Sequence, residues 1–393
     1  MNTMYVAAFA AVSSLLMLVH EPQTKSNPAP DPIYEDVAWN KSAVAWLLKA
    51  QSPNGGWGAG SHSYQNIRDP HAVQTDPATT SFAAMALMKA GGKFETNPYK
   101  NEIAKALDHV LKDIEDRPDN GRITSLTGTQ PQVKLGIHID ASMALQFLTA
   151  MREEVKDPAL EQKIDKAAAV CIDLIQGSQN ADGGWAGGGW APVLQSAMAN
   201  NALELAQSRY AVDQKAIDNS RMYQANNIGT DGVRADDAAG VPLYAAASAQ
   251  RATAQDARVV EELIPSGVLA GVSGEGKISK ALQEKGIDRD KADRLAKSYT
   301  TNVASTRELE SNEIWDGFGN NGGEEYLSYM LTSESLAQQG KTKWESWRQT
   351  IEPKFKSTQN QDGSWSGQHC ITSPVFCTAA VIQAWNAGVI NEQ

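Results

Sequence analysis

The chain has 393 residues, 41% hydrophobic and 21% charged, a balance typical of a folded globular protein with a sizeable core. The formal net charge is −11 and no basic stripe stands out, which argues against nucleic acid as a partner. Glycine concentrates in short runs, which indicates shaped loops between helices.

The first 32 residues differ in character from the rest of the chain. Residues 5–19 form an apolar run that is too short for a comfortable membrane span and suits the h-region of a signal peptide. A buried N-terminal helix is the alternative, since no Lys or Arg precedes the run. We expect a signal or anchor segment with a proline-rich linker at 1–32, an exported or membrane-tethered protein, and one folded domain at 33–393.

One short phrase occurs three times along the chain, with glutamine, glycine and tryptophan at fixed spacing. The copies are Gln51/Gly55/Trp57, Gln179/Gly183/Trp185 and Gln359/Gly363/Trp365. Each copy follows an apolar pattern of helical period and precedes a stretch that is apolar on nearly every face. The repeat predicts a unit of outer helix, Gly-Trp loop and inner helix. In each loop the glutamine would bond backbone at a helix end, and the indole N–H would find a partner.

Helical patterns fill most of the remaining chain, and no run alternates convincingly as a strand. We count about twelve helices, or six pairs, the number that closes a double ring. The predicted fold class is therefore all-α, an α/α-toroid of about six inner and six outer helices. Residues 253–320 break this rhythm with many charges, and we interpret them as an inserted, solvated helical segment.

The three phrases resemble the QW repeats of squalene cyclases and the repeats of protein prenyltransferase β subunits, at repeat level over residues 38–390. The stretches 322–329 and 368–377 look like those of a bacterial group described only as prenyltransferase/squalene-oxidase-repeat proteins. The resemblance implies an α/α-toroid with an apolar central cavity, and it leaves the cofactor unknown.

The chain departs from both named families at their catalytic signatures. Cyclases of this kind place their proton donor in a D-x-D-D motif, whereas the nearest stretch here is Arg234, Ala235, Asp236 and Asp237. An arginine in the first position would lower a neighbouring carboxyl pKa and weaken the acid. The Asp, Cys and His ligands of the prenyltransferase zinc site are not in the family's order either, so we expect no zinc site of that kind and name no metal ligands.

Polar residues at or before the first turn of each inner helix would gather at one mouth of a toroid. As catalytic candidates we take Glu324, Glu325, Tyr326, His369, Asp140, His138 and Asp76. As binding candidates we take His71, Gln195, Asp236, Asp237 and Thr372. Such residue types support acid–base chemistry or a metal ion held by His and carboxylate ligands, but for each acid taken singly helix capping is the favoured interpretation.

Three functions remain open from the sequence. The first is a toroid of the cell envelope that binds or transforms an isoprenoid or other lipid in a central cavity. The second is a non-catalytic binding or scaffold protein, and the third is a carbohydrate-active toroid of the polysaccharide-lyase kind. Whether Cys370 and Cys377 form a local disulfide or stay free thiols is also open.

Overall fold

The computed structural model describes residues 37–388, apart from residues 187, 230–231, 265, 270 and 272–273. The described residues from Ala38 onward form one compact unit. The signal or anchor segment expected at 1–32 lies outside the described residues and stays a prediction. Within the described part, no helix combines the length and the apolar character that a membrane crossing requires.

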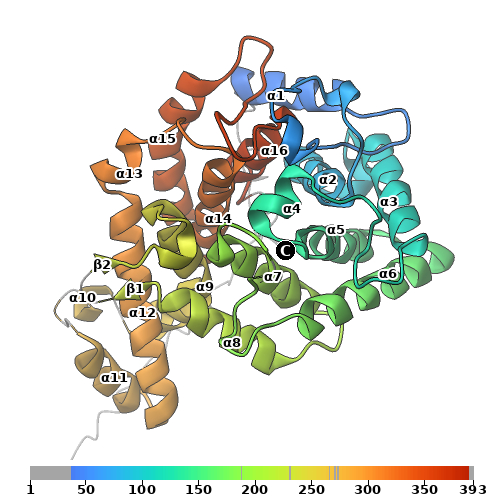
Figure 1. Ribbon diagram of the computed structural model, residues 1–393. Helices are drawn as coiled ribbons and strands as arrows, with labels where there is room; N and C mark the ends of the chain where they lie inside the picture. Colours follow the sequence, from blue (N-terminus) through green and yellow to red (C-terminus); the bar gives the residue numbers. More distant parts are fainter. Residues whose placement is uncertain are drawn as a thin grey trace, which may run out of the picture. The chain divides into compact units, whose positions relative to one another are not determined.

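An inner ring of helices forms the centre of this unit, each packed against the next and the last against the first (Figure 1). In ring order they are α2 (Pro77–Gly91), α5 (Ile139–Glu154), α7 (Pro192–Ala206), α9 (Pro242–Leu263), α14 (Gly323–Gln339) and α16 (Pro374–Trp385). α2 is buried continuously from Pro77 to Met88, because neighbours cover it on all sides. The prediction of inner helices is confirmed.

An outer layer of helices covers this ring. It comprises α1 (Ala38–Lys49), α3 (Lys100–Glu115), α6 (Pro158–Gly177), α8 (Gln214–Ala225), α12 (Arg289–Leu309) and α15 (Lys341–Thr358). These helices bury only one stripe. In α3, for example, Ile103, Leu107, Val110 and Ile114 are buried at spacings of three and four residues. The predicted double ring of helix pairs is therefore confirmed, and the fold is an all-α toroid.

Short elements connect the pairs. They are α4 (Gln130–Leu135), α10 (Ser266–Leu269), α11 (Glu275–Glu284), α13 (Asn312–Asp316), and the 3₁₀ turns His62–Tyr64, Pro70–Ala72, Phe94–Thr96 and Asp236–Ala238. The strands β1 (Ile228–Gly229) and β2 (Gly232–Val233) pair antiparallel, with Ile228 opposite Val233. Two residues per strand are too few for an alternating pattern, so this hairpin could not be predicted from the sequence.

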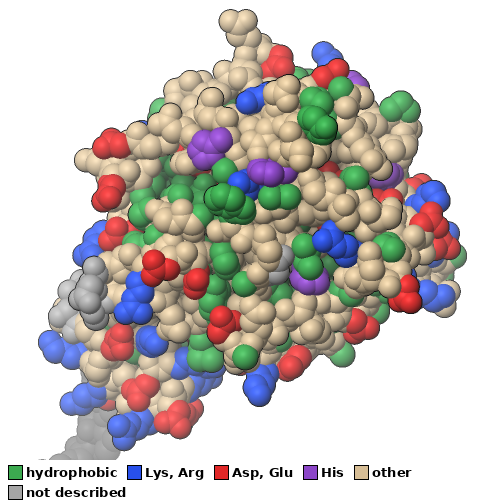
Figure 2. Space-filling view, viewed as in Figure 1, with side chains coloured by type: hydrophobic (Ala, Val, Ile, Leu, Met, Phe, Trp, Pro, Cys, Tyr) green, Lys and Arg blue, Asp and Glu red, His purple; other side chains and the backbone are tan. Residues whose placement is uncertain are grey.

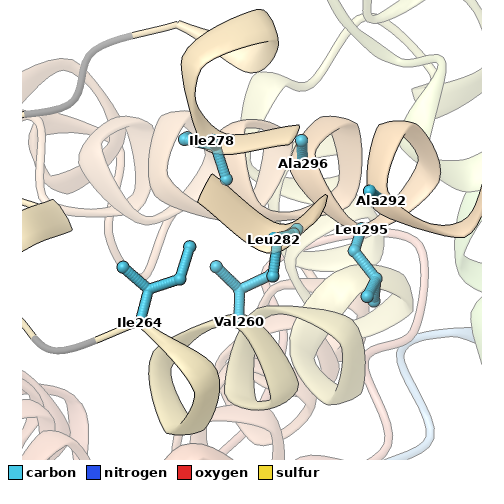
Figure 3. Close-up of a cluster of buried hydrophobic side chains, with 7 residues drawn as sticks. All are labelled: Val260, Ile264, Ile278, Leu282, Ala292, Leu295 and Ala296. Carbon is cyan, nitrogen blue, oxygen red and sulfur yellow. The ribbon is translucent and has the colours of Figure 1, made fainter. Parts of the chain in front are cut away.

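Residues 253–320, interpreted above as an insertion, divide between the ring and an extension of it. The first part continues α9 to Leu263, and α12 packs along α9 as its outer helix. Between them, α11 contacts α12. Figure 3 shows the small core that joins these helices, built by Val260, Ile264, Ile278, Leu282, Ala292, Leu295 and Ala296. This second core explains how a segment rich in charge stays folded beside the ring.

The three Gly-Trp loops have one geometry, in which the indole closes the end of the preceding outer helix. Trp57 Nε1 donates to Leu47 O at 2.9 Å, Trp185 Nε1 to Ile175 O at 2.8 Å, and Trp365 Nε1 to Phe355 O at 2.9 Å. The backbone N–H of each tryptophan donates to a hydroxyl of the following inner helix, from Thr80, Ser196 or Thr378. Each loop therefore ties an outer helix to its inner partner.

The glutamine of each loop ties that pair to another outer helix. Gln51 Nε2 donates to Glu102 O of α3, Gln179 Nε2 to Ala216 O of α8, and Gln359 Nε2 to Trp39 O of α1. The same nitrogens also hold their own loops through Gly55 O, Gly183 O and Gly363 O. These three glycines adopt a φ between 86° and 95°, a region that costs a side chain energy. The predicted roles of glutamine and tryptophan are confirmed.

Candidate functional site at the mouth of the ring

Two distant stretches meet at the end of the ring where the inner helices begin, which we call the mouth. Gly323 N donates to Ile371 O at 2.7 Å, and Gln368 N donates to Asn321 O at 2.8 Å. The approach is tight, because a Cβ on Gly322 would lie 2.3 Å from His369 O. The segments that precede α14 and α16 thus form one surface.

Glu324 lies in this contact and is almost fully buried, with 3% of its surface exposed. Its Oε2 accepts a hydrogen bond from Ile371 N at 3.3 Å. Burial raises the pKa of the Glu324 carboxyl to about 7, although these backbone contacts and the charge of Lys134 oppose the shift. Near neutral pH this carboxyl is therefore able both to hold and to release a proton.

Cys370 lies beside Glu324 in a strained backbone conformation, with φ at 65° although it is not a glycine. Its half-buried thiol is free and lies 2.9 Å from His369 Nδ1. Burial and the neighbouring Glu324 raise the pKa of the thiol, while the ammonium of Lys134 lowers it. Cys377 is also a free thiol, fully buried in α16, so the two cysteines are not joined in the structure.

The short helix α4 supplies two residues that the sequence did not single out. Gln130 and Lys134 are four residues apart and therefore share a face of the helix. Gln130 Oε1 accepts from Thr372 N at 2.7 Å and from Ser373 N at 3.0 Å, which fixes α4 against the loop before α16. Lys134 is 4% exposed, and its Nζ lies 4.0 Å from the ring centroid of Trp190.

Asp76 and Asp140 are two further buried acids, at the beginnings of α2 and α5. Asp76 caps α2, accepting from Thr79 N at 2.7 Å, and it also accepts from Ala59 N at 2.9 Å. Asp140 accepts from Gln132 Nε2 at 2.8 Å. Burial raises the pKa of Asp76 to about 6 and, together with the charge on Asp76, raises that of Asp140 to about 7.

Glu325 and Tyr326 are held in place by a neighbouring loop and by the core. Glu325 Oε1 accepts from Gly319 N at 2.8 Å and its Oε2 from Asn321 N at 3.1 Å, so this carboxylate pins the loop before α14. Burial raises the pKa of Glu325, against these hydrogen bonds. Tyr326 is buried among Phe318 and Phe355, with ring centroids 6.3 Å and 6.4 Å away. Both residues have structural partners.

Three further candidates, Thr372, Gln195 and His138, are fully or partly buried. The Thr372 hydroxyl donates to Gln65 O at 2.7 Å, and the amide of Gln195 faces the carbonyl oxygens of Leu135 and Trp185, to which it donates at 3.2 Å and 3.1 Å. His138 is half-buried, and burial lowers its pKa.

Three candidates are exposed or lie apart from Glu324. His71 is exposed and its Nε2 lies 3.0 Å from Lys49 O. Asp236 and Asp237 are exposed on the 3₁₀ turn before α9. The catalytic and binding roles assigned to all these residues stay predictions. In the part of the chain that the structure describes, no three His, Cys, Asp or Glu side chains converge as metal ligands would.

A pocket of about 160 Å³ lies at the opposite end of the ring, among the last turns of the inner helices. Its lining combines apolar side chains such as Met85, Met88 and Leu205 with the amides of Gln146 and Asn201. The cavity is thus small and mostly apolar, with a few polar side chains in its lining.

Comparisons with known proteins give the same fold. The model of the squalene-hopene cyclase C-terminal domain matches residues 32–116. Among solved structures, an inactive variant of the α-1,6-mannanase of Salegentibacter sp. HEL1_6, in complex with α-1,6-mannotriose, superposes with a TM-score of 0.52. It is 10% identical, over 89% of this chain and 99% of that one. No curated protein matches the sequence. The predicted cyclase-like α/α-toroid is confirmed, and at this identity the structural likeness extends to the fold alone.

Proposed function

We propose that the toroid binds a saccharide at its mouth and cleaves it with Glu324 as the proton donor. The observation that carries the proposal is the Glu324 carboxyl, which is buried at the mouth with a pKa of about 7. Glycosidic cleavage needs such an acid, because a carboxyl that is still protonated near neutral pH can protonate the leaving oxygen. As the C–O bond breaks, the proton passes from Glu324 to that oxygen. Water then adds its hydroxyl to the sugar carbon, and the proton that this water loses restores the Glu324 carboxyl.

Exposed aromatic side chains near the mouth support a saccharide. Trp190 is 65% exposed and Tyr64 is 63% exposed. Trp190 lies over Lys134 of α4, while the segment of Tyr64 contacts the other end of α4, where Gln130 N donates to Gly60 O at 2.9 Å. Large exposed rings beside polar groups are typical of ligand surfaces, and the flat face of a sugar stacks on them. The saccharide bound to the mannanase of the same fold adds support.

Export, expected from the apolar run at residues 5–19, belongs to the same proposal. An exported enzyme would meet polysaccharides outside the cytoplasm.

The experiment that tests the proposal measures release of reducing ends from a panel of polysaccharides. Glu324→Gln should lose activity about a hundredfold, whereas the exposed Glu310→Gln should keep it. Activity should also fall as the pH rises through about 7, because the donor loses its proton. Equal activities of the two variants would overturn the role of Glu324.

An isoprenoid or other lipid ligand is the second candidate. Two observations favour it, the match of residues 32–116 to a cyclase domain and the apolar part of the pocket formed by Met85, Met88 and Leu205. Mass spectrometry of lipids that co-purify with the protein tests this candidate directly. A chain that retains neither lipid nor saccharide would instead favour the scaffold alternative.

A further inference from the structure

We propose that the saccharide taken at the mouth carries negative charge, as carboxylate or sulfate groups, and that Lys134 recognises that charge. This inference rests on the proposed function and adds the substrate class.

Lys134 is a buried cation without a fixed counterion. Among the described residues, no carboxylate lies within ion-pair distance of its ammonium. The acid that acts on it most directly is Glu324, which is only partly ionised at neutral pH. The Lys134 ammonium contacts the Cys370 thiol and the Trp190 ring, and neither supplies a full negative charge. A buried charge is costly unless an opposite charge pairs with it, so this ammonium is suited to an external anion.

A second donor on the same face of α4 is the side-chain amide of Gln130. Gln130 is fully buried, and its Oε1 is occupied by backbone N–H groups of Thr372 and Ser373. Its Nε2 has no hydrogen-bond partner among the described residues. Buried amide nitrogens are rarely left unsatisfied, and this nitrogen can donate only to an acceptor. The ammonium of Lys134 and the amide of Gln130 therefore call for an acceptor-rich ligand.

Trp190 provides the surface on which the ring of such a ligand would lie. The loop before it is held close to α4, because Trp190 N donates to Lys134 O at 3.0 Å. A Cβ on Gly189 would lie 2.7 Å from Gly136 N, so only glycine allows this approach. The indole is thereby fixed over the Lys134 ammonium while most of its own surface remains exposed.

The charge distribution agrees with an anionic ligand. The whole chain carries −11, yet burial raises the pKa of three acids at the mouth, to about 7 for Glu324 and Asp140 and to about 6 for Asp76, so part of their negative charge is neutralised near neutral pH. Lys134 and Arg122 lie among them, and Arg122 Nη1 is buried without a partner. Figure 2 shows histidine and Lys or Arg side chains toward the middle of one face, with most Asp and Glu nearer its edge. The local field should attract anions.

Calorimetric titration tests the inference with oligosaccharides of equal length. The probes are an oligouronate, a sulfated oligosaccharide and a neutral manno-oligosaccharide, with geranylgeranyl diphosphate as the lipid arm. The wild-type chain should bind at least one acidic probe about tenfold tighter than the neutral one, and added salt should weaken that binding. Lys134→Met should lose this preference, whereas Lys166→Met, an exposed lysine of α6, should keep it. Trp190→Ala should weaken acidic and neutral probes alike.

The outcomes separate the two proposals. If acidic and neutral probes bind equally and Lys134→Met changes neither, the inference fails while the saccharide function stands. If no saccharide binds, both proposals fail, and binding of the diphosphate alone would favour the lipid candidate. Thermal unfolding of each variant shows whether it is folded. Should Lys134→Met unfold, Lys134→Gln takes its place, since it keeps a hydrogen-bond donor and removes only the charge.

Discussion

Gln359 and Trp39 lie 320 residues apart, yet Gln359 Nε2 donates to Trp39 O at 2.9 Å. This hydrogen bond joins the last Gly-Trp loop to the first described helix, and it closes the outer layer of the toroid. The equivalent bonds of Gln51 and Gln179 join helices that are much closer in the chain.

Replacing any of these three glutamines by alanine should lower the free energy of unfolding by about 1–2 kcal/mol, because two backbone acceptors lose a donor. Urea unfolding followed by circular dichroism measures the change. Gln361→Ala, at an exposed position of the same loop as Gln359, is the control and should change stability by less than about 0.5 kcal/mol. Equal effects of Gln359→Ala and Gln361→Ala would mean that the closing bond does not stabilise the ring.

Glu324 should make stability depend on pH in a defined direction. Burial raises its pKa to about 7, above the unfolded value of 4.5, so the stabilisation of the protonated form is complete at low pH. It is lost as the pH rises through about 7. Between pH 4 and pH 8 the wild-type chain should therefore lose about 3 kcal/mol that Glu324→Gln keeps.

The measurement for Glu324 is the difference in unfolding free energy between wild type and Glu324→Gln at several pH values. The other titrating groups are common to both chains and cancel in this difference. A difference that does not change with pH would show that folding leaves the pKa of Glu324 unshifted.

Glu204 should behave in the opposite way. It accepts from Arg221 Nε at 2.7 Å and from Arg251 Nη2 at 2.8 Å. Burial opposes ionisation of Glu204, but the charges and hydrogen bonds of the two guanidinium groups outweigh burial and lower the pKa of its carboxyl. Its stabilisation is therefore present above the unfolded pKa and is lost as the pH falls through the folded one. Glu204→Gln should cost about 3 kcal/mol at pH 7, because the buried Arg251 and the partly buried Arg221 both lose this carboxylate.

A matched control for Glu204 is the exposed pair of Arg258 and Glu262, whose side chains are 58% and 59% exposed. Glu262→Gln should cost less than about 1 kcal/mol, since solvent screens the pair. Chemical unfolding of both variants at pH 7 and pH 4 gives the comparison. If the two variants lose equal stability, the buried position of Glu204 contributes nothing extra.

The fold could be predicted from the sequence because the same arrangement of outer helix, Gly-Trp loop and inner helix occurs three times. Each Gln-Gly-Trp phrase uses contacts within a single loop and two helix ends, so its spacing is visible along the chain. The meeting of residues 322–329 with 368–377 also followed, since inner helices begin at the same end of the ring. An inference of this kind needs only the direction in which each inner helix runs.

Individual side chains at the mouth were harder to predict. Successive helical residues point about 100° apart, so Glu324 enters the mouth while Glu325 bonds a loop and Tyr326 joins the core. Lys134 and Trp190 could not be predicted as site residues, because neither lies in a repeat. Their importance arises only when the loop of Trp190 folds over α4, and that contact leaves no pattern in the sequence.

Cys370 should be the one thiol that reacts in the native protein. The chain has three cysteines, and Cys171 and Cys377 are completely buried, whereas Cys370 is half-buried at the mouth. An aromatic disulfide reagent should therefore modify one thiol rapidly in buffer and all three in urea, and Cys370→Ser should abolish the rapid phase.

The thiolate is the reactive form, so the rate of modification of Cys370 reports the charges around its sulfur. Lys134→Met should slow the reaction, because the ammonium lowers the thiol pKa, and Glu324→Gln should speed it, because the carboxylate raises that pKa. Opposite signs for the two variants are the signature of this cluster, and equal rates would show that Lys134 and Glu324 do not act on the thiol.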